Sequence, residues 1–213
     1  MGTIRRGILG GFSGKVGTVV GSSWKGIAYM RSLPQSVKNP RTLRQRSQRT
    51  KFALALSLLQ PLTGFLRTGW KLFAHRQSPF NAAMAYTMAN AVLGEYPDYE
   101  IDPSKVLVSR GALTPVTDTF VSATIDREVQ LQWDDNSSKG SAKPTDKALI
   151  AIVNLAKGEA ITDTEGALRP DCTKTIPVPA EWSGDKVHVY MGFISEDGME
   201  VANSVYLGAV KIS

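Results

Sequence analysis

The sequence of 213 residues contains few cysteines and histidines, the residues that most often form disulfides or bind metal ions. It has one cysteine, Cys172, and two histidines, so an intrachain disulfide and a cysteine-based zinc site are excluded. No apolar run approaches the roughly 18–20 residues that a membrane-spanning helix needs. The glycine-rich stretch after Arg5 and Arg6 lacks the apolar core of a secretory signal peptide, which favours a cytoplasmic or virion-associated location.

Acidic residues are absent from the first 94 positions. This stretch contains 14 Lys and Arg, and the first carboxylate is that of Glu95. Residues 95–213 contain 19 acidic and 11 basic residues, so the net charge of +6 combines a part of +14 with a part of −8. Such a basic stretch favours a polyanionic or acidic partner, with a solvated basic face as the alternative. Opposite charges on the two parts also allow copies to assemble head to tail.

Glycine is concentrated near the N-terminus, with six glycines between positions 7 and 21. This density excludes a stable helix. The β-rich segments 15–20 and 24–30 flank residues 21–23, which predicts a glycine-rich hairpin with its turn at 21–23. An isolated hairpin is marginal in water and has to pack against something. We therefore expect an assembly hairpin in which another backbone approaches closely at Gly14, Gly17 and Gly21.

Three helices are predicted after the hairpin, over residues 42–59, 62–74 and 78–93. Thr42 fits a helix N-cap, and Gln45 three residues later completes a capping box. The first half of that helix projects basic side chains on all sides, which is typical of a helix bound to a partner or to solvent. Residues 95–103 then form a predicted linker.

After residue 105 the apolar residues follow a period of two, which is typical of strands. About seven short strands separated by turn clusters predict a β-sandwich, with Trp133 as an anchor of its core. The predicted strands cover residues 106–109, 120–125, 129–133, 148–153, 173–178, 186–194 and 201–212. The sequence thus predicts an α+β protein: a basic region of a hairpin plus about three helices over 1–103, and a sandwich domain over 104–213.

The predicted sandwich resembles a fibronectin type III or related immunoglobulin-like module. The residues that carry this resemblance are Leu131-Gln-Trp133, Thr175 to Pro179, Val187 to Ile194 and Ser204 to Leu207. The resemblance implies a spacer or binding unit, and a fold of this kind does not by itself fix a function.

The whole chain also resembles, end to end, an uncharacterised family that recurs in Bacteroidota. The resemblance is carried by Gly11 to Gly17, Tyr29 to Ser32, Asn39 to Phe52, Phe80-Asn81, Tyr96 to Tyr99 and Val201 to Val205. It implies no particular activity. The hairpin followed by Asn-Pro-Arg-Thr at 39–42 is similar to proteins of phage and prophage particles, which implies a role in a particle.

Patterns for catalysis, cofactor binding and metal binding are not found in the sequence. Gly14-Lys15 departs from a P-loop, because Leu9 stands at the first glycine position and Val16 replaces the Ser or Thr. His75 and His188 fall in different predicted domains. We therefore expect no enzyme, no cofactor and no metal site.

Two classes of function remain open. The first is a structural or assembly protein, such as a subunit of a phage-like particle or another large complex, whose partners are copies of itself or other subunits. The second is a nucleic-acid-binding protein in which Trp24 and Tyr29 stack on bases, unless these rings pack the hairpin onto the helices. A third reading, a surface adhesive module, needs an export signal. The cations predicted to contact phosphates or a partner are Lys15, Lys25, Arg31, Arg41, Arg44, Arg46, Arg49 and Lys51.

Overall fold

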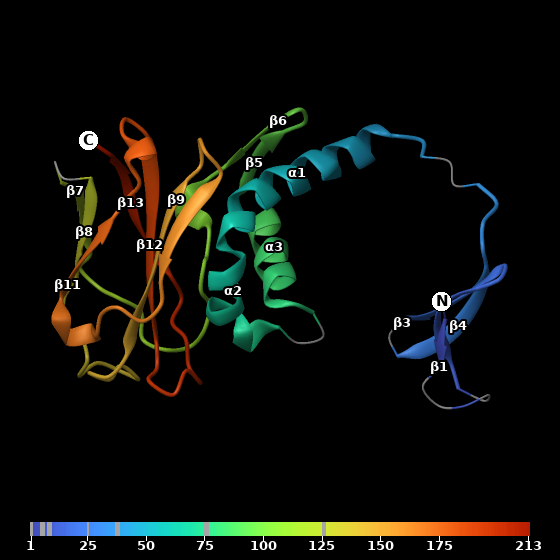
Figure 1. Ribbon diagram of the computed structural model, residues 1–213, viewed down its shortest axis with the longest axis horizontal. Coiled ribbons are helices and arrows are strands. Elements are labelled where there is room, and N and C mark those ends of the chain that lie inside the picture. The colour runs from blue at the N-terminus through green and yellow to red at the C-terminus, as the bar shows by residue number, and fades with distance from the viewer. Residues whose placement is uncertain are drawn as a thin grey trace. The chain divides into compact units, whose positions relative to one another are not determined.

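The computed structural model describes residues 2–4, 7, 10–24, 26–36, 39–74, 77–124 and 127–213. The chain divides into two compact units, Met1–Thr42 and Leu43–Ser213. The boundary expected between residues 103 and 104 lies inside the second unit, which we call the helix–sandwich unit. Figure 1 labels the elements of both units.

The first unit is an antiparallel sheet in the strand order β1-β2-β3-β4, which we call the N-terminal sheet. Its strands are β1 (Thr3–Ile4), β2 (Phe12–Val16), β3 (Val19–Trp24) and β4 (Ile27–Ser32). Gly21 lies inside β3 and pairs with Gly14 and Met30, so the turn predicted at 21–23 is wrong. The turn instead falls at Gly17-Thr18, where Gly17 has a φ of +59°. A two-residue turn of this kind matches the twist of the strands that it joins.

Three helices open the helix–sandwich unit: α1 (Leu43–Leu59), α2 (Thr63–Gly69) and α3 (Pro79–Asn90). Helix α1 begins directly after the predicted cap, Thr42. Ser78 caps α3, and its side chain accepts a hydrogen bond from the Asn81 backbone N–H at 3.1 Å. Helix α2 is shorter than predicted and ends at Gly69, where the backbone passes close to Val108.

The segment predicted as a linker folds as a hairpin of β5 (Val92–Glu95) and β6 (Asp98–Ile101). This hairpin contacts α1 through Tyr99. The Tyr99 and Ser47 hydroxyls are 2.7 Å apart, and Lys51 Nζ lies 4.7 Å from the centre of the Tyr99 ring. The linker prediction is therefore wrong, because the hairpin is packed against the helix.

The predicted β-sandwich is confirmed. A sheet in the order β10-β9-β12-β13 faces a sheet in the order β11-β8-β7. The core between them contains Leu131 and Ile176 from one sheet, Ile150 and Met191 from the other, and the predicted anchor Trp133. The strands are β7 (Phe120–Ala123), β8 (Glu128–Gln132), β9 (Lys147–Asn154), β10 (Glu159–Asp163), β11 (Thr173–Pro177), β12 (Lys186–Ile194) and β13 (Val205–Lys211).

Three strand predictions differ from the structure, and one of them is the strand predicted over 201–212, which covers only Val205–Lys211. Strand β10 was not predicted, and residues 106–109 form no strand, although Val106 and Val108 are buried. These residues run beside Gly69 and Ser204 and donate backbone hydrogen bonds to the Ser204 hydroxyl. An apolar segment is thus buried here without joining a sheet.

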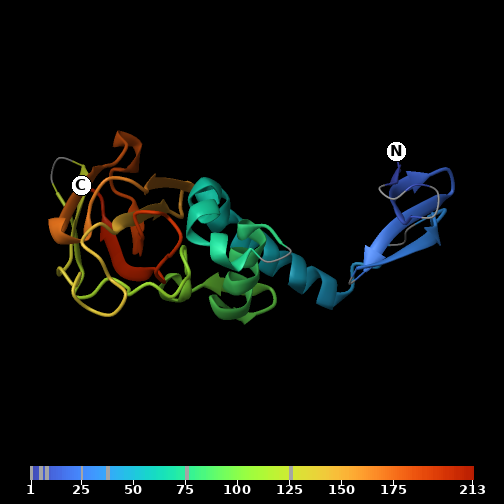
Figure 2. The same cartoon turned by 90° about the horizontal axis from the view of Figure 1, so that it is seen from below.

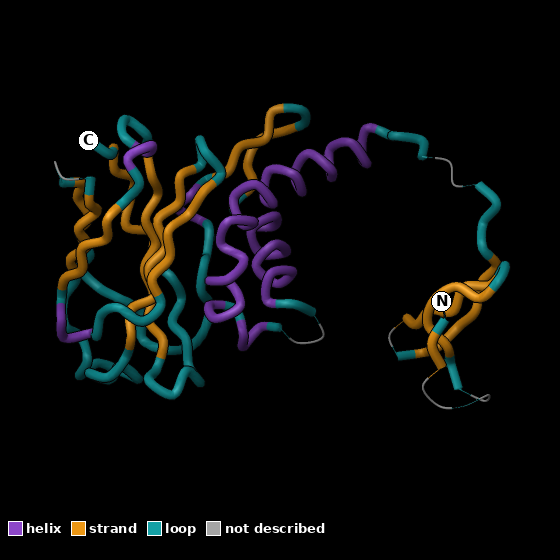
Figure 3. Tube along the Cα trace, viewed as in Figure 1, coloured by secondary structure: helices purple, strands orange, loops and turns teal. Residues whose placement is uncertain are grey.

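The helices cover the outer face of the four-stranded sheet. A second hydrophobic core joins Leu58 and Leu66 of the helices to Leu149, Val153 and Tyr190 of β9 and β12. After its first residue, β9 is buried throughout, because one face meets the helices and the other meets the second sheet. The helix–sandwich unit therefore has three layers; Figure 3 distinguishes the helices from the strands by colour, and Figure 2 shows the unit from below.

Candidate interface on the N-terminal sheet

One face of the N-terminal sheet carries basic and aromatic side chains that were predicted to contact a partner. Residues directly opposite each other on neighbouring antiparallel strands share a face. Lys15 pairs with Val20, and Val20 pairs with Arg31, so one row across three strands has a cation at each end. The pairing continues in two further rows, Ser22 with Tyr29 and Trp24 with Ile27. We call these seven residues the cationic–aromatic face.

The opposite face is partly covered by the sheet itself. A Cβ atom at Gly21 would collide with the carbonyl oxygen and the ring of Phe12, and one at Gly11 would collide with the Cβ of Ala28. Gly21 is buried as a result. The close backbone approach predicted at Gly21 is therefore made by Phe12 of the same sheet.

Gly14 and Gly17 are explained by their backbone conformation. Their φ angles of +104° and +59° favour glycine over other residues. No atom lies within 4 Å of a Cβ built at Gly17, so the turn there is open. A β-branched residue at position 17 would strain this turn whether or not the sheet contacts a partner. Assembly is better tested at other positions.

The N-terminal sheet exposes large apolar side chains. Trp24 is 65% exposed and Met30 is 71% exposed. The others in this unit are Val16, Ile27, Tyr29 and Leu33. Within the described ranges, every buried hydrophobic side chain lies at Ala55 or later. Sheets in water normally have at least one apolar face covered, so this unit presents a surface that suits a partner.

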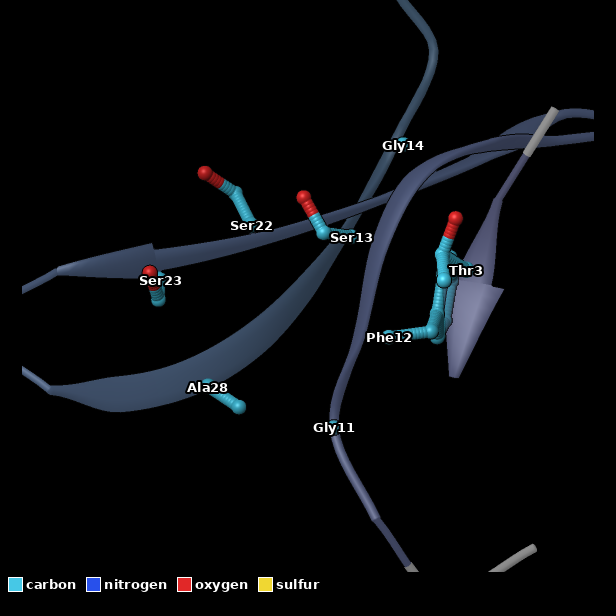
Figure 4. A pocket seen from close by; sticks show the side chains of 8 residues that line it. All are labelled: Thr3, Gly11, Phe12, Ser13, Gly14, Ser22, Ser23 and Ala28. Carbon is cyan, nitrogen blue, oxygen red and sulfur yellow. The ribbon is translucent and has the colours of Figure 1, made fainter. Parts of the chain in front are cut away.

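A cavity of about 630 Å³ opens along the N-terminal sheet (Figure 4). It is lined by Thr3, Gly11, Phe12, Ser13, Gly14, Ser22, Ser23 and Ala28. The hydroxyls of Ser13 and Ser22 point in the same direction, as expected for residues on the same face. This lining offers hydroxyl groups and backbone but includes no carboxylate, imidazole or thiol that would make a nucleophile–base pair.

The other described cations predicted to contact a partner are not on strands of the N-terminal sheet. Those exposed before α1 and along its first turns are Arg41, Arg44, Arg46 and Arg49. Lys51 is half-buried because it stacks on Tyr99. Lys25 lies outside the described residues. Of the eight predicted cations, the structure thus places Lys15 and Arg31 with the two predicted aromatic residues.

Three residues of this face, Val20, Ser22 and Ile27, were not predicted to belong to it. The signal for the first two is Gly17-Thr18, because a two-residue turn fixes the pairing of Val16 with Val19 and so the register of β2 on β3. The turn was instead predicted at 21–23, and that position implies a different register.

In the part of the chain that the structure describes, no group of three or more His, Cys, Asp or Glu side chains is placed to hold a metal ion. No described helix combines the length and the apolar character needed to cross a membrane.

Comparisons with known proteins give a few similar solved structures and a family. No curated protein matches the chain. Similar solved structures include the FN1–FN3 domains of chicken CNTN1, at 10% identity and a TM-score of 0.39, over 49% of this chain and 36% of that one. Another is the fn3 domain of human collagen alpha-1(XX) chain, at 12% identity and a TM-score of 0.34, over 49% of this chain and 90% of that one. Residues 11–208 match the "Family of unknown function (DUF6266)", and the chain belongs to this family.

Proposed function

We propose that this chain is a non-enzymatic structural subunit of a larger complex and that it assembles through its N-terminal sheet. The observation that carries the proposal is the exposure of Trp24, Ile27 and Met30 in a unit whose described residues include no buried hydrophobic side chain. Burial of each such side chain against a partner contributes about 1.5–3 kcal/mol before the costs of association. A covered sheet is therefore more stable than an uncovered one.

The charge distribution favours a second copy of the chain as the partner. Residues 1–42 contain seven Lys and Arg and no acid, whereas residues 95–213 have a net charge of −8. Two N-terminal sheets repel each other, but the sheet of one copy attracts the acidic part of another. A contact between two different surfaces builds rings or filaments. Such repetition suits a phage-like particle or another large complex.

Mass in solution, measured by light scattering after size exclusion at low and high salt, tests the proposal. We expect an oligomer that survives high salt and is free of nucleic acid by its absorbance ratio. Met30→Ser is expected to lower the mass at a given concentration, because it removes an exposed apolar contact. Met199→Ser is the matched control, since Met199 is similarly exposed, at 66%, in the helix–sandwich unit.

Removal of residues 1–42 provides a second test of assembly through the N-terminal sheet. The fragment 43–213 keeps every buried hydrophobic side chain of the described chain, so we expect a folded monomer. A full-length chain that stays monomeric at all concentrations would overturn the proposal. Equal loss of mass in Met30→Ser and Met199→Ser would overturn the role of the N-terminal sheet.

A second candidate function is nucleic-acid binding through phosphate contacts. The observation that favours it is the gathering of Lys15, Arg31, Trp24 and Tyr29 on one face. Affinity that depends on phosphate contacts falls by orders of magnitude between low and moderate salt. A protein that shows no salt-dependent binding to mixed DNA or RNA would eliminate this candidate.

A further inference from the structure

We infer that the cationic–aromatic face of the N-terminal sheet binds single-stranded nucleic acid, with Tyr29 and Trp24 stacking on bases and Lys15 and Arg31 contacting phosphates. The inference deepens the second candidate function above, because it names the form of nucleic acid and the face that takes it. It does not depend on assembly of the chain.

The order of side chains on the face matches an extended single strand. Along β4 the face carries Arg31, then Tyr29, then Ile27, each two residues apart and so about 6.7 Å from the next. That step is comparable to the distance between neighbouring bases in an extended single strand. Trp24 stands beside Ile27 on β3, which places the two rings on adjacent rows. The rings thus follow the cations along one direction.

The exposure of the two rings favours unpaired bases. Trp24 is 65% exposed and Tyr29 is 42% exposed, and exposed aromatic rings are the groups on which bases stack without regard to sequence. The bases of a duplex are already stacked on each other and present only their edges, so exposed rings favour an unpaired strand.

The charge of the N-terminal unit favours a partner that carries phosphates. Residues 1–42 contain no carboxylate, so nothing in the sequence of this unit offsets the attraction of Lys15 and Arg31 for phosphate. An acidic protein surface would also meet these cations. It would not use the exposed aromatic surface beside them as bases do, and for this reason a nucleic acid fits the face better.

Intrinsic tryptophan fluorescence gives a direct readout of the face. The chain has four tryptophans, and Trp70, Trp133 and Trp182 are each at most 3% exposed, whereas Trp24 is largely exposed. A short oligo(dT) that stacks on Trp24 is expected to quench the exposed part of the emission. Trp24→Phe should abolish the quenching yet keep most of the affinity, because phenylalanine also stacks.

Fluorescence anisotropy of labelled oligo(dT) measures the affinities. Loss of one base stack in Tyr29→Ala or Trp24→Ala is expected to weaken binding about 5- to 150-fold. Loss of both phosphate contacts in Lys15→Ala with Arg31→Ala should reduce the slope of log affinity against log salt by about 1.4. Met199→Ser changes an exposed methionine of the helix–sandwich unit and is the matched control, with affinity expected to stay unchanged.

Three results would overturn the inference. They are equal affinity for a duplex of the same length, unchanged affinity in Trp24→Ala and Tyr29→Ala, and equal competition by polyglutamate, which would indicate an acidic protein partner. Failure of assembly is distinguished from failure of nucleic-acid binding because it appears as a monomeric mass in light scattering. A monomer that binds oligo(dT) through this face supports the inference and overturns the structural proposal. An oligomer that does not bind oligo(dT) supports the structural proposal and overturns the inference.

Discussion

Arg169 and Asp146 form a salt bridge of 2.9 Å between Nη2 and Oδ2, and neither side chain has any exposure to solvent. The guanidinium also donates to Asn136 Oδ1 and to the carbonyl oxygen of Thr114, and it lies 3.8 Å from the centre of the Phe193 ring. One buried arginine therefore joins loop segments of the sandwich that are far apart in the sequence.

Arg169→Met is expected to lower the free energy of unfolding by about 3–5 kcal/mol, because it leaves the Asp146 carboxylate buried without a counter-charge. Urea unfolding measures the change. Lys174→Met is the matched control: Lys174 pairs with Asp163 at 3.3 Å, but both side chains are partly exposed, so the expected loss is about 0–1 kcal/mol. Equal losses in the two variants would contradict the importance of the buried pair.

Two glycines of α2 are predicted to respond in opposite directions to replacement by alanine. Apart from its chain neighbours and the backbone of its own helix, no atom lies within 4 Å of a Cβ at Gly64, so Gly64→Ala should raise the free energy of unfolding by about 0.5–1 kcal/mol through helix propensity. A Cβ at Gly69 would lie 2.5 Å from the Val108 carbonyl oxygen, so Gly69→Ala should lower it by about 1–3 kcal/mol. Stabilisation by both substitutions in urea unfolding would contradict the close packing of α2 on residue 108.

His188 is predicted to make stability depend on pH near neutrality. Burial lowers the pKa of His188, and the charge of Lys186 lowers it further. Its Nδ1 lies 2.9 Å from the Tyr206 hydroxyl, and the two rings stack. Because the unfolded chain takes up the proton first, at about pH 6.5, stability is constant above that pH and falls as the pH drops toward the lower folded pKa.

Urea unfolding at about pH 7.5 and about pH 5.5 tests this dependence. The native chain should be less stable at the lower pH, and His188→Gln should reduce the difference. Hydrogen bonds from Ser104 and Ser195 lower the pKa values of Asp102 and Asp197. These two carboxyls therefore change stability only below about pH 4, outside this range. An unchanged pH dependence in His188→Gln would refute the assignment.

Local signals predicted much of the helix–sandwich unit. The alternation of apolar residues around Trp133 gave β8, and the predicted bounds of β12 are those observed, because each strand lies with a face on a core. The starts of α1 and α3 followed from Thr42 and Ser78, since caps act within a few residues.

Features that depend on distant contacts were not predictable in the same way. The change of period near residue 105 was read as a domain boundary, but periodicity does not report which faces are buried together. Tyr99 was assigned to a linker although it contacts α1, and no local pattern encodes that contact. The residues of the cationic–aromatic face were mostly identified, but their shared orientation depends on the register set at Gly17-Thr18.

The burial of β9 and β12 on both faces limits how this protein can be rearranged by recombination. A gene segment encoding residues 104–213 alone would yield a chain in which Leu149, Val153 and Tyr190 meet water instead of the helices. Such a chain would carry a contiguous apolar surface and tend to aggregate. The sandwich is therefore not an independently folding domain, and we expect the helices and the strands to be inherited together.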